Sequence, residues 1–456
     1  MKKGLIFALL LACMGALAEN SGWLYVEVGV SDKGVGSGYV TNANWRLSAS
    51  RPKGTSNLEL SGMSGEFYGS EPAPMDFTIV TNTAGEAYKV TKFGQFSHYG
   101  SGANPTLMAY KNMLSEFVAP DCKNIYYEGC FCDCKALTKV VLAEGATISH
   151  NRTFQGCGAL KSFSPRKFSA LGSMQFLSCA SLPGSFSITN TTTIGSQLFS
   201  GCAKLEEVIA PKVTTVKESA FSGCASLTNV VLSSAATSME QYAFNGCAKL
   251  TTDVVQRLLC KSLTQLWKLN GTTRTGSVFS GCTGIDGTLV WNLPNLAADV
   301  VASGMFSGCG NLKGVIFKTP VSSIGGDAFS GIGEAAEIYL AAEVASFGRK
   351  AILRQSAPFP KVYLKDNIDA WLTNMAADAQ HDVIRAADFN DTSWTGAKPW
   401  STITGKMAQD TAMCKKEGGV VTVYDKKVLA FLMWDNAKGG CWVLRAPVTG
   451  TKIMVQ

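Results

Sequence analysis

The sequence of 456 residues predicts a repeat solenoid, in which short stacked units each lay one strand into a parallel β-sheet. Three observations support this fold class. A Phe-x-x-Cys unit recurs about every 23 residues through the middle of the chain. Each copy is followed by a leucine and then by residues that alternate with the two-residue period of a strand. The composition, 46% hydrophobic and 16% charged, excludes a mainly disordered chain.

The first 18 residues predict an export signal. Lys2 and Lys3 give a basic start, residues 5–12 are an apolar run, and residues 16–18 (Ala-Leu-Ala) form a small-residue cleavage site. The apolar run is shorter than the roughly 20 residues that span a bilayer. We therefore expect a secreted or cell-surface protein without a membrane span. The alternative is that Cys13 carries a lipid.

Residues 19–107 are expected to form a β-rich N-terminal cap with degenerate repeats, because the end of a solenoid must be covered. The strand-like runs, separated by Gly, Ser and Pro, are Trp23–Val30, Trp45–Ser50, Asn57–Leu60 and Asp76–Thr81. The glycines at 34, 36 and 38 lack the strand-to-helix context of a dinucleotide loop and are interpreted as a hairpin turn.

Residues 108–365 are expected to contain the repeats. Each unit should bury a phenylalanine, a cysteine that acts as a small hydrophobe with a weak S–H donor, and an apolar residue three positions later. The predicted core residues are Phe131, Cys134, Leu137, Phe154, Cys157, Leu160, Phe176, Cys179, Phe199, Cys202, Leu205, Phe221, Cys224, Leu227, Phe244, Cys247, Leu250, Phe279, Cys282, Phe306, Cys309, Leu312 and Phe329.

Stacking at about 4.8 Å should bring the phenylalanines into one column. In the strand after Leu227, Val230 and Leu232 are expected on one face and Val231 on the other. Between Leu250 and Phe279 the extra residues have a helix-like apolar spacing, which predicts a short helix on the convex side. The alternative is a ligand-specific protrusion.

The copies at residues 220–232 (AFSGCASLTNVVL), 243–250 (AFNGCAKL) and 305–317 (MFSGCGNLKGVIF) resemble the BspA-type, or Treponema-type, leucine-rich repeats of bacterial surface proteins. The resemblance implies a right-handed leucine-rich-repeat coil with a parallel sheet on the concave face and turns or short helices on the convex face. It also implies a role in adhesion to host or cell-surface proteins, without naming a partner.

The C-terminal part is expected to close the solenoid. Lys361–Leu364 should be the last strand, and residues 366–387 a capping helix similar to the closing element of this repeat family. A linker rich in Thr, Ser, Gly, Asp and Lys follows at 388–416. Residues 417–456 predict a small antiparallel β module with strands at 419–424, 427–434 and 440–445.

Fifteen cysteines in an exported chain suggest disulfides, but eight of them occupy one position of the repeat. Parallel side chains in stacked coils have poor disulfide geometry, so we expect a ladder of reduced thiols. The cluster Cys122, Cys130, Cys132 and Cys134 lacks zinc-knuckle spacing, so a disulfide from Cys122 to Cys130 or Cys132 is favoured over a metal. Cys414 and Cys441 are the best candidate pair near the C-terminus, although sequence alone cannot fix connectivity.

The sequence predicts no enzyme, no cofactor and no metal. It has three histidines, and it contains no Gly-x-Ser-x-Gly, Gly-x4-Gly-Lys-Ser/Thr or His-Glu-x-x-His motif. The formal charge of +7 over 456 residues is too small to indicate a nucleic-acid partner.

The candidate binding residues lie one and two positions after the core leucines, where a concave sheet would expose them. They are Thr138, Lys139, Lys161, Glu206, Glu207, Thr228, Asn229 and Lys313. Their charges are mixed and they include no aromatic residue, which disfavours a sugar platform or a nucleic-acid groove. We expect a scaffold for host or cell-envelope proteins, with membrane contact only through export or envelope anchoring. The alternatives are a self-associating envelope component and a merely solvated sheet.

Overall fold

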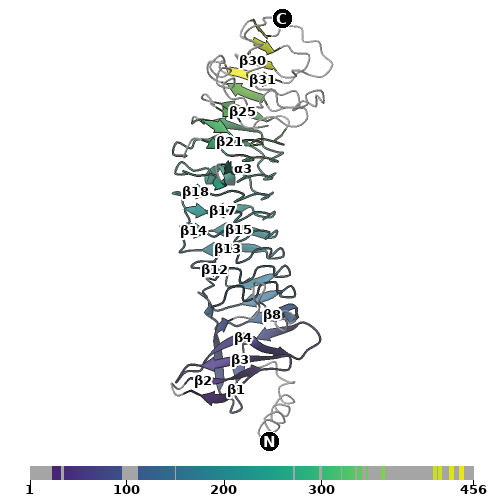
Figure 1. Cartoon of the computed structure of the whole chain (residues 1–456), viewed down its shortest axis with the longest axis vertical. Helices are drawn as coiled ribbons and strands as arrows, with labels where there is room; N and C mark the ends of the chain where they lie inside the picture. The colour runs from purple at the N-terminus through teal and green to yellow at the C-terminus, as the bar shows by residue number, and fades with distance from the viewer. Residues whose placement is uncertain are drawn as a thin grey trace. The chain divides into compact units, whose positions relative to one another are not determined.

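The computed structural model describes residues 23–31, 35–94, 111–148, 150–270, 273–296, 300–319, 321–333 and 336–340, together with short strands further on (Figure 1). The chain divides into two units, residues 1–213 and 214–456, which are taken in turn. The predicted export signal and the predicted capping helix at 366–387 lie outside the described residues. None of the helices in the described part has both the length and the hydropathy to cross a bilayer.

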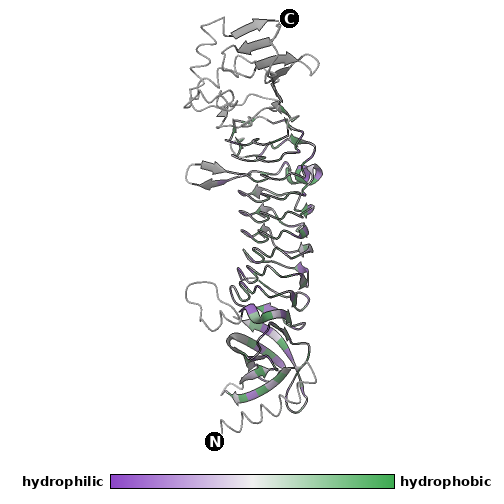
Figure 2. Ribbon diagram, turned by 90° about the vertical axis from the view of Figure 1, so that its right-hand side faces the viewer, coloured by the Kyte–Doolittle hydropathy of each residue, from purple (hydrophilic) through white to green (hydrophobic). Residues whose placement is uncertain are grey.

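Unit 1 begins with a closed β-barrel. Its strands are β1 (Trp23–Val30), β2 (Gly36–Thr41), β3 (Trp45–Arg51), β4 (Asn57–Phe67), β6 (Val80–Thr81) and β7 (Ala87–Gly94). They follow the order β4-β3-β2-β1-β6-β7, and β4 pairs with β7 to close the ring. Polar and apolar residues alternate along these strands (Figure 2), and Trp45, Leu58 and Phe93 are buried inside.

The barrel differs from the predicted cap with degenerate repeats. Its neighbouring strands are mostly antiparallel, whereas repeats would stack their strands in parallel. Closure through β4 and β7 leaves those two strands without an open edge, which protects them from pairing with another chain. Two pairings join these N-terminal strands to the repeats: β5 (Ala73–Asp76) pairs with β8 (Leu114–Val118), and β7 pairs in parallel with β9 (Asn124–Ile125).

The repeats of unit 1 lay parallel strands into two successive sheets. The first has the order β11-β10-β8-β5, with β10 (Lys139–Val141) and β11 (Ser162–Ser164). The second begins at β12 (Lys167–Phe168) and continues through β13 (Gly184–Ile188) and β15 (Leu205–Ile209). Pro165 lies between the sheets, and a proline has no N–H to donate to a ladder. The remaining short elements are η1 (Lys111–Met113), β9 (Asn124–Ile125) and β14 (Thr193–Ile194).

Unit 2 continues the same design. Its main parallel sheet has the order β21-β23-β25-β27, and a second, short-stranded sheet has the order β22-β24-β26. The elements in chain order are β16 (Thr215–Val216), β17 (Asn229–Val231), β18 (Ser238–Met239), α3 (Thr252–Leu258), β19 (Lys268–Asn270), β20 (Thr273–Thr275), β21 (Thr288–Trp291), β22 (Val300–Val301), β23 (Gly314–Phe317), β24 (Ser323–Ile324), β25 (Glu337–Leu340), β26 (Ser346–Phe347) and β27 (Lys361–Leu364).

The predicted C-terminal strands extend this main sheet instead of standing apart from it. The elements are β28 (Cys414–Glu417), β29 (Val420–Val423), β30 (Phe431–Asp435) and β31 (Cys441–Arg445), and β31 pairs antiparallel with β27. The sheet order β31-β30-β29-β28 places two strands between those that begin with Cys414 and Cys441. Because strands are spaced about 4.8 Å apart, this order does not support the predicted disulfide between them.

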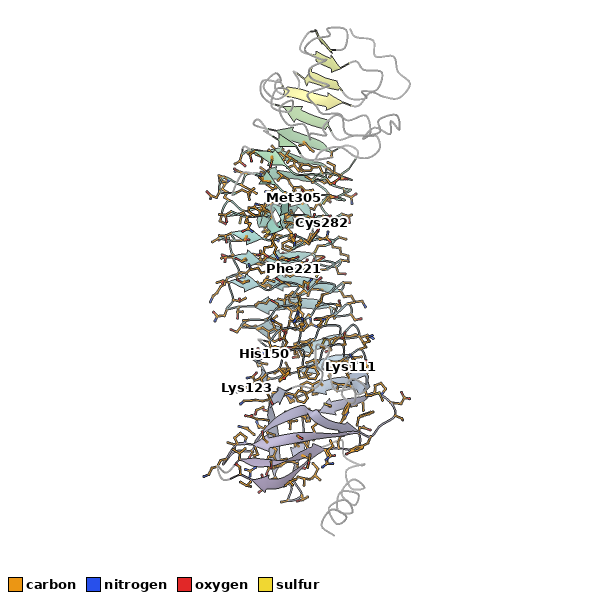
Figure 3. All side chains as sticks on the ribbon, viewed as in Figure 1. Lys111, Lys123, His150, Phe221, Cys282 and Met305 are labelled. Atoms are coloured by element: carbon orange, nitrogen blue, oxygen red, sulfur yellow. The ribbon has the colours of Figure 1, made fainter. Side chains whose placement is uncertain are left out.

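The repeat phenylalanines form a ring column in each unit, as predicted. In unit 1 the ring centroids of Phe131 and Phe154 are 5.3 Å apart, and those of Phe154 and Phe176 are 5.7 Å apart, each pair with an interplanar angle of 7°. In unit 2 the centroids of Phe221 and Phe244 are 5.2 Å apart. Phe221 and Cys282, labelled in Figure 3, are fully buried within the coils. These columns form the hydrophobic cores that a single repeat of about 23 residues cannot build alone.

A ladder of cysteine thiols runs beside each column. The thiol donates a hydrogen bond to the carbonyl oxygen of the phenylalanine one copy earlier, as from Cys157 to Phe131 at 3.1 Å and from Cys309 to Phe279 at 3.0 Å. The same bond is made by Cys179, Cys202, Cys247 and Cys282. These six cysteines are free, so the predicted reduced ladder is confirmed for them.

The predicted disulfide from Cys122 is wrong. Cys122 is a free, fully buried cysteine, and its thiol reaches the carbonyl oxygen of Asn124 at 3.5 Å. Sequence spacing can bring cysteines near each other, but it does not set the side-chain directions that a disulfide requires.

The inserted helix α3 lies in the strand layer, not on the opposite side as predicted. It stands between β17 and β21 (Figure 1). The side chain of Gln256 accepts the N–H of Val290 in β21 at 2.7 Å and donates to the carbonyl of Val290 at 3.0 Å. The Gln256 amide thus takes the place of a neighbouring strand. The antiparallel hairpin of β19 and β20 belongs to the same insertion.

Candidate protein-binding face

The predicted binding residues of unit 1 are partly occupied by contacts within the fold. Thr138 donates its hydroxyl to the carbonyl of Ser115 at 2.9 Å, which makes it a link between neighbouring strands. Lys139 pairs with Glu116 on the next strand at 3.1 Å, and both side chains remain about 40% exposed. Such a pair stabilises the fold little but presents two charges in a fixed position.

The other predicted residues of unit 1 present their side chains to solvent. Lys161 and Glu206 are exposed and Glu207 is half-buried. Glu206 and Glu207 are the second and third residues of β15, and Lys161 directly precedes β11. These three residues therefore lie beside the parallel strands of the repeats and contribute both signs of charge.

In unit 2 the predicted residues have separate surroundings. Thr228 and Lys313 are exposed, each one residue before a strand. Asn229 is half-buried, and its side-chain oxygen accepts a hydrogen bond from Arg257 of α3 at 2.7 Å. Asn229 is therefore part of the contact between strand β17 and the inserted helix.

The predicted set of binding residues left out the apolar members of the outward sheet face. These residues follow the buried central valine or its equivalent in each strand, and they are Val141 and Ile209 in unit 1 and Val231, Val290 and Ile316 in unit 2. Ile209 is 36% exposed. The signal was available, because period-two alternation assigns these positions to the face opposite the core.

A shallow hollow of about 320 Å³ opens in unit 1 where the ladder stops at Pro165. Its lining residues are Glu144, Ser164, Pro165, Arg166, Lys167, Ser185, Phe186, Ser187 and Ile209. The Arg166 guanidinium lies 5.0 Å from the centroid of the Phe186 ring and donates to the carbonyl of Pro183. Burial lowers the pKa of Arg166, and the charge of Glu206 opposes that shift. The hollow thus combines a positioned cation, hydroxyls and an exposed isoleucine.

The buried thiols have little chemistry to offer. Burial raises the pKa of Cys122 and of Cys309 to about 12, so each is held as a neutral thiol at physiological pH. Within the described residues no cluster of His, Cys, Asp and Glu has an arrangement that could hold a metal ion. The candidate site is therefore the outward sheet face, which offers binding groups.

Comparison with known proteins places the repeats in a family. The model of the BspA type leucine rich repeat region matches six copies, over residues 108–212, 169–266 and 258–357, which together make up more than half of the chain. A search of the curated proteins found no match.

A search of the solved structures found leucine-rich repeat proteins among the matches. A leucine-rich repeat protein from Bacteroides ovatus ATCC 8483 has 20% identity and a TM-score of 0.45, covering 69% of this chain and 81% of its own. A leucine rich cell surface protein from Faecalibacterium prausnitzii A2-165 has 17% identity and a TM-score of 0.33, covering 66% and 93%. The T. pallidum leucine rich repeat protein has 19% identity and a TM-score of 0.28, covering 37% and 75%.

The phenylalanine columns and the cysteine ladder fall inside the residues that the family model matches. This chain belongs to the BspA-type leucine-rich repeat family.

Proposed function

We propose that this protein is an exported, non-enzymatic scaffold that binds host or cell-envelope proteins through the outward sheet face of its repeats. The observation that carries the proposal is the composition of that face in unit 1. It sets the Lys139–Glu116 pair, the charges of Lys161 and Glu206, and the exposed Ile209 on or directly beside strands that are fixed by a packed core.

The mechanism is geometric. Each exposed pair or single apolar contact is worth little, so affinity must come from many contacts made at once. Because the phenylalanine columns and cysteine ladders hold the strands in register, the face loses little conformational entropy when a partner binds. Mixed charge favours a partner with its own mixed, complementary pattern over a uniformly charged polymer such as nucleic acid.

Export is the second part of the proposal and rests on the predicted signal at residues 1–18. N-terminal sequencing of the protein recovered from the producing bacterium should give a chain that begins near Glu19. Recovery of an intact Met1 from the cytoplasm would contradict export.

The binding test uses the purified mature chain and a panel of immobilised envelope and host surface proteins. The double variant Lys161→Glu with Glu206→Lys keeps the net charge and should weaken binding by roughly tenfold, since it reverses charges on the face. The matched control is Lys135→Glu with Glu71→Lys, which changes exposed residues outside the strands.

Binding that falls equally in both double variants would show that the face is the wrong surface. Sedimentation of the chain over a range of concentrations tests the alternative function, which is self-association. Concentration-dependent self-association without binding to the panel would replace the adhesive scaffold with a structural envelope component.

A further inference from the structure

We propose that unit 2 carries a peptide-binding pocket at the break in its sheet, where α3 stands in place of a strand beside β17. The pocket would take an extended peptide segment of a partner protein, with an apolar side chain in the pocket and an acidic side chain facing Arg257. This inference deepens the proposed function and rests on it, because it names one place where a protein partner would be recognised.

The break is asymmetric. On the β21 side, α3 is closely joined to the sheet by Gln256 and by Thr252, whose hydroxyl oxygen accepts the N–H of Gly287 at 2.7 Å. On the β17 side the links come from Arg257 of α3 and from the chain that follows the helix. They include the Arg257–Asn229 hydrogen bond and, beyond the strand, the hydroxyl of Ser262 on the carbonyl of Ala236 at 2.7 Å.

A pocket of about 340 Å³ lies on the β17 side. It is lined by Val230, Val231, Leu232, Ser233, Ser234, Ala236, Arg257, Leu258 and Cys260. This volume is near the lower end of the roughly 300 to 1,000 Å³ that ligand pockets occupy, which suits one or two side chains of a peptide.

The edge of β17 offers main-chain groups to an extended peptide. At the equivalent position of a repeat in unit 1, the N–H of Leu142 donates a hydrogen bond to the carbonyl of Ser164 on the following strand, at 2.7 Å. The corresponding N–H in unit 2 belongs to Leu232, which follows β17, the last strand of its sheet. The strand that it would bond is replaced by α3. Peptides commonly bind by adding a strand at such an edge.

The side chains at the break favour an apolar and acidic occupant. Leu142 is 4% exposed, whereas its counterpart Leu232 is only half-buried and lines the pocket. Arg257 is exposed at the rim, and no carboxylate among the described residues forms a salt bridge with it. A peptide would complement both groups if it packed an apolar side chain against Leu232 and placed a carboxylate beside Arg257.

The test uses full-length mature protein and a displayed library of random linear dodecapeptides. Selected peptides should carry an apolar residue close to Asp or Glu. Their affinity should fall roughly tenfold in Arg257→Glu, because the charge facing the peptide is reversed. The matched control is Lys261→Glu, a change of the same charge at an exposed residue that is not part of the lining.

A second readout reports occupancy directly. Cys260 lines the pocket and is half-buried, whereas the ladder cysteines are buried. A bound peptide should slow alkylation of Cys260, measured by mass spectrometry on the unmutated protein, by roughly tenfold. Because this readout needs no substitution, it holds even if Arg257→Glu disturbs the fold.

Three results would overturn the inference: a library that gives no binding peptide, peptides that bind Arg257→Glu and Lys261→Glu equally well, or peptides that leave Cys260 alkylation unchanged. These failures can be told apart from failure of the scaffold proposal. If a surface protein binds the chain and its affinity is unchanged by Arg257→Glu, the scaffold proposal is supported and only the pocket proposal is contradicted.

Discussion

Single residues stabilise this fold because each one also supports its copies in the neighbouring coils. The ring of Phe244 stacks on Phe221 at 5.2 Å and on Phe279 at 5.7 Å, and it is fully buried. Removing it therefore opens a cavity against two neighbouring rings at once.

We predict that Phe244→Ala lowers the free energy of unfolding by about 3 to 5 kcal/mol, measured by urea denaturation. The control is Tyr242→Asn, two residues away at a side chain that is 40% exposed, which should cost less than about 1 kcal/mol. Equal losses in the two variants would contradict the column as the source of stability.

The buried thiols predict a loss of stability at alkaline pH. The pKa of Cys309 is raised from 9.0 to about 12 by burial, so the folded chain keeps a proton that the unfolded chain releases. The contribution of this thiol is complete below pH 9 and is lost as the pH rises toward 12. Urea unfolding between pH 8 and 11 should show the decline.

The control for that experiment is Cys309→Ala, which lacks the titrating group. Its unfolding free energy should fall less steeply with pH than that of the unaltered chain. If the two slopes coincide, burial of this thiol is not a cause of the alkaline loss.

At the scale of elements, the decisive contact is the side chain of Gln256 on strand β21. We predict that Gln256→Ala costs about 1 to 3 kcal/mol, because the N–H and carbonyl of Val290 lose their partner. Hydrogen exchange at the amide of Val290 should accelerate more than exchange at Val315 in β23. Asp253→Asn, at an exposed position of α3, is the control and should leave both rates nearly unchanged.

The elements also show what a sequence can and cannot predict. The period of about 23 residues is visible because each copy must place the same ring in the same column. The layer of α3 was mispredicted because a helical spacing shows that residues 252–258 form a helix, but not which layer of the repeat the helix occupies. The barrel was missed because the pairing of β4 with β7 joins segments that are distant in the chain.

At the scale of the whole molecule, the cysteines are placed for packing instead of cross-linking. We predict that denatured, unreduced protein has at least nine titratable thiols among its 15 cysteines. They are Cys122, Cys134, Cys157, Cys179, Cys202, Cys247, Cys260, Cys282 and Cys309. A sample reduced before denaturation gives the total, and a count near zero without reduction would contradict the reduced ladder.

The sequence predicted the charged residues of the candidate face but not its hollow or its pocket. Its charged positions, such as Lys161 and Glu206, were found because they follow a recognisable leucine. The hollow beside Arg166 and the pocket beside Leu232 were not, because both arise where the ladder of strands is interrupted. A repeat pattern describes the average copy, whereas these two features belong to the exceptions.

The spacing of the rings has a practical consequence for engineering. Phe244 and Phe279 are 35 residues apart in the chain, yet their centroids are separated by 5.7 Å, as in copies without an insertion. The pitch of the coil is therefore set by the aromatic pair and is indifferent to the length of chain between its members. The hairpin of β19 and β20 within this segment is a natural site for insertion, at which a foreign epitope can be grafted while α3 and the two rings keep their contacts.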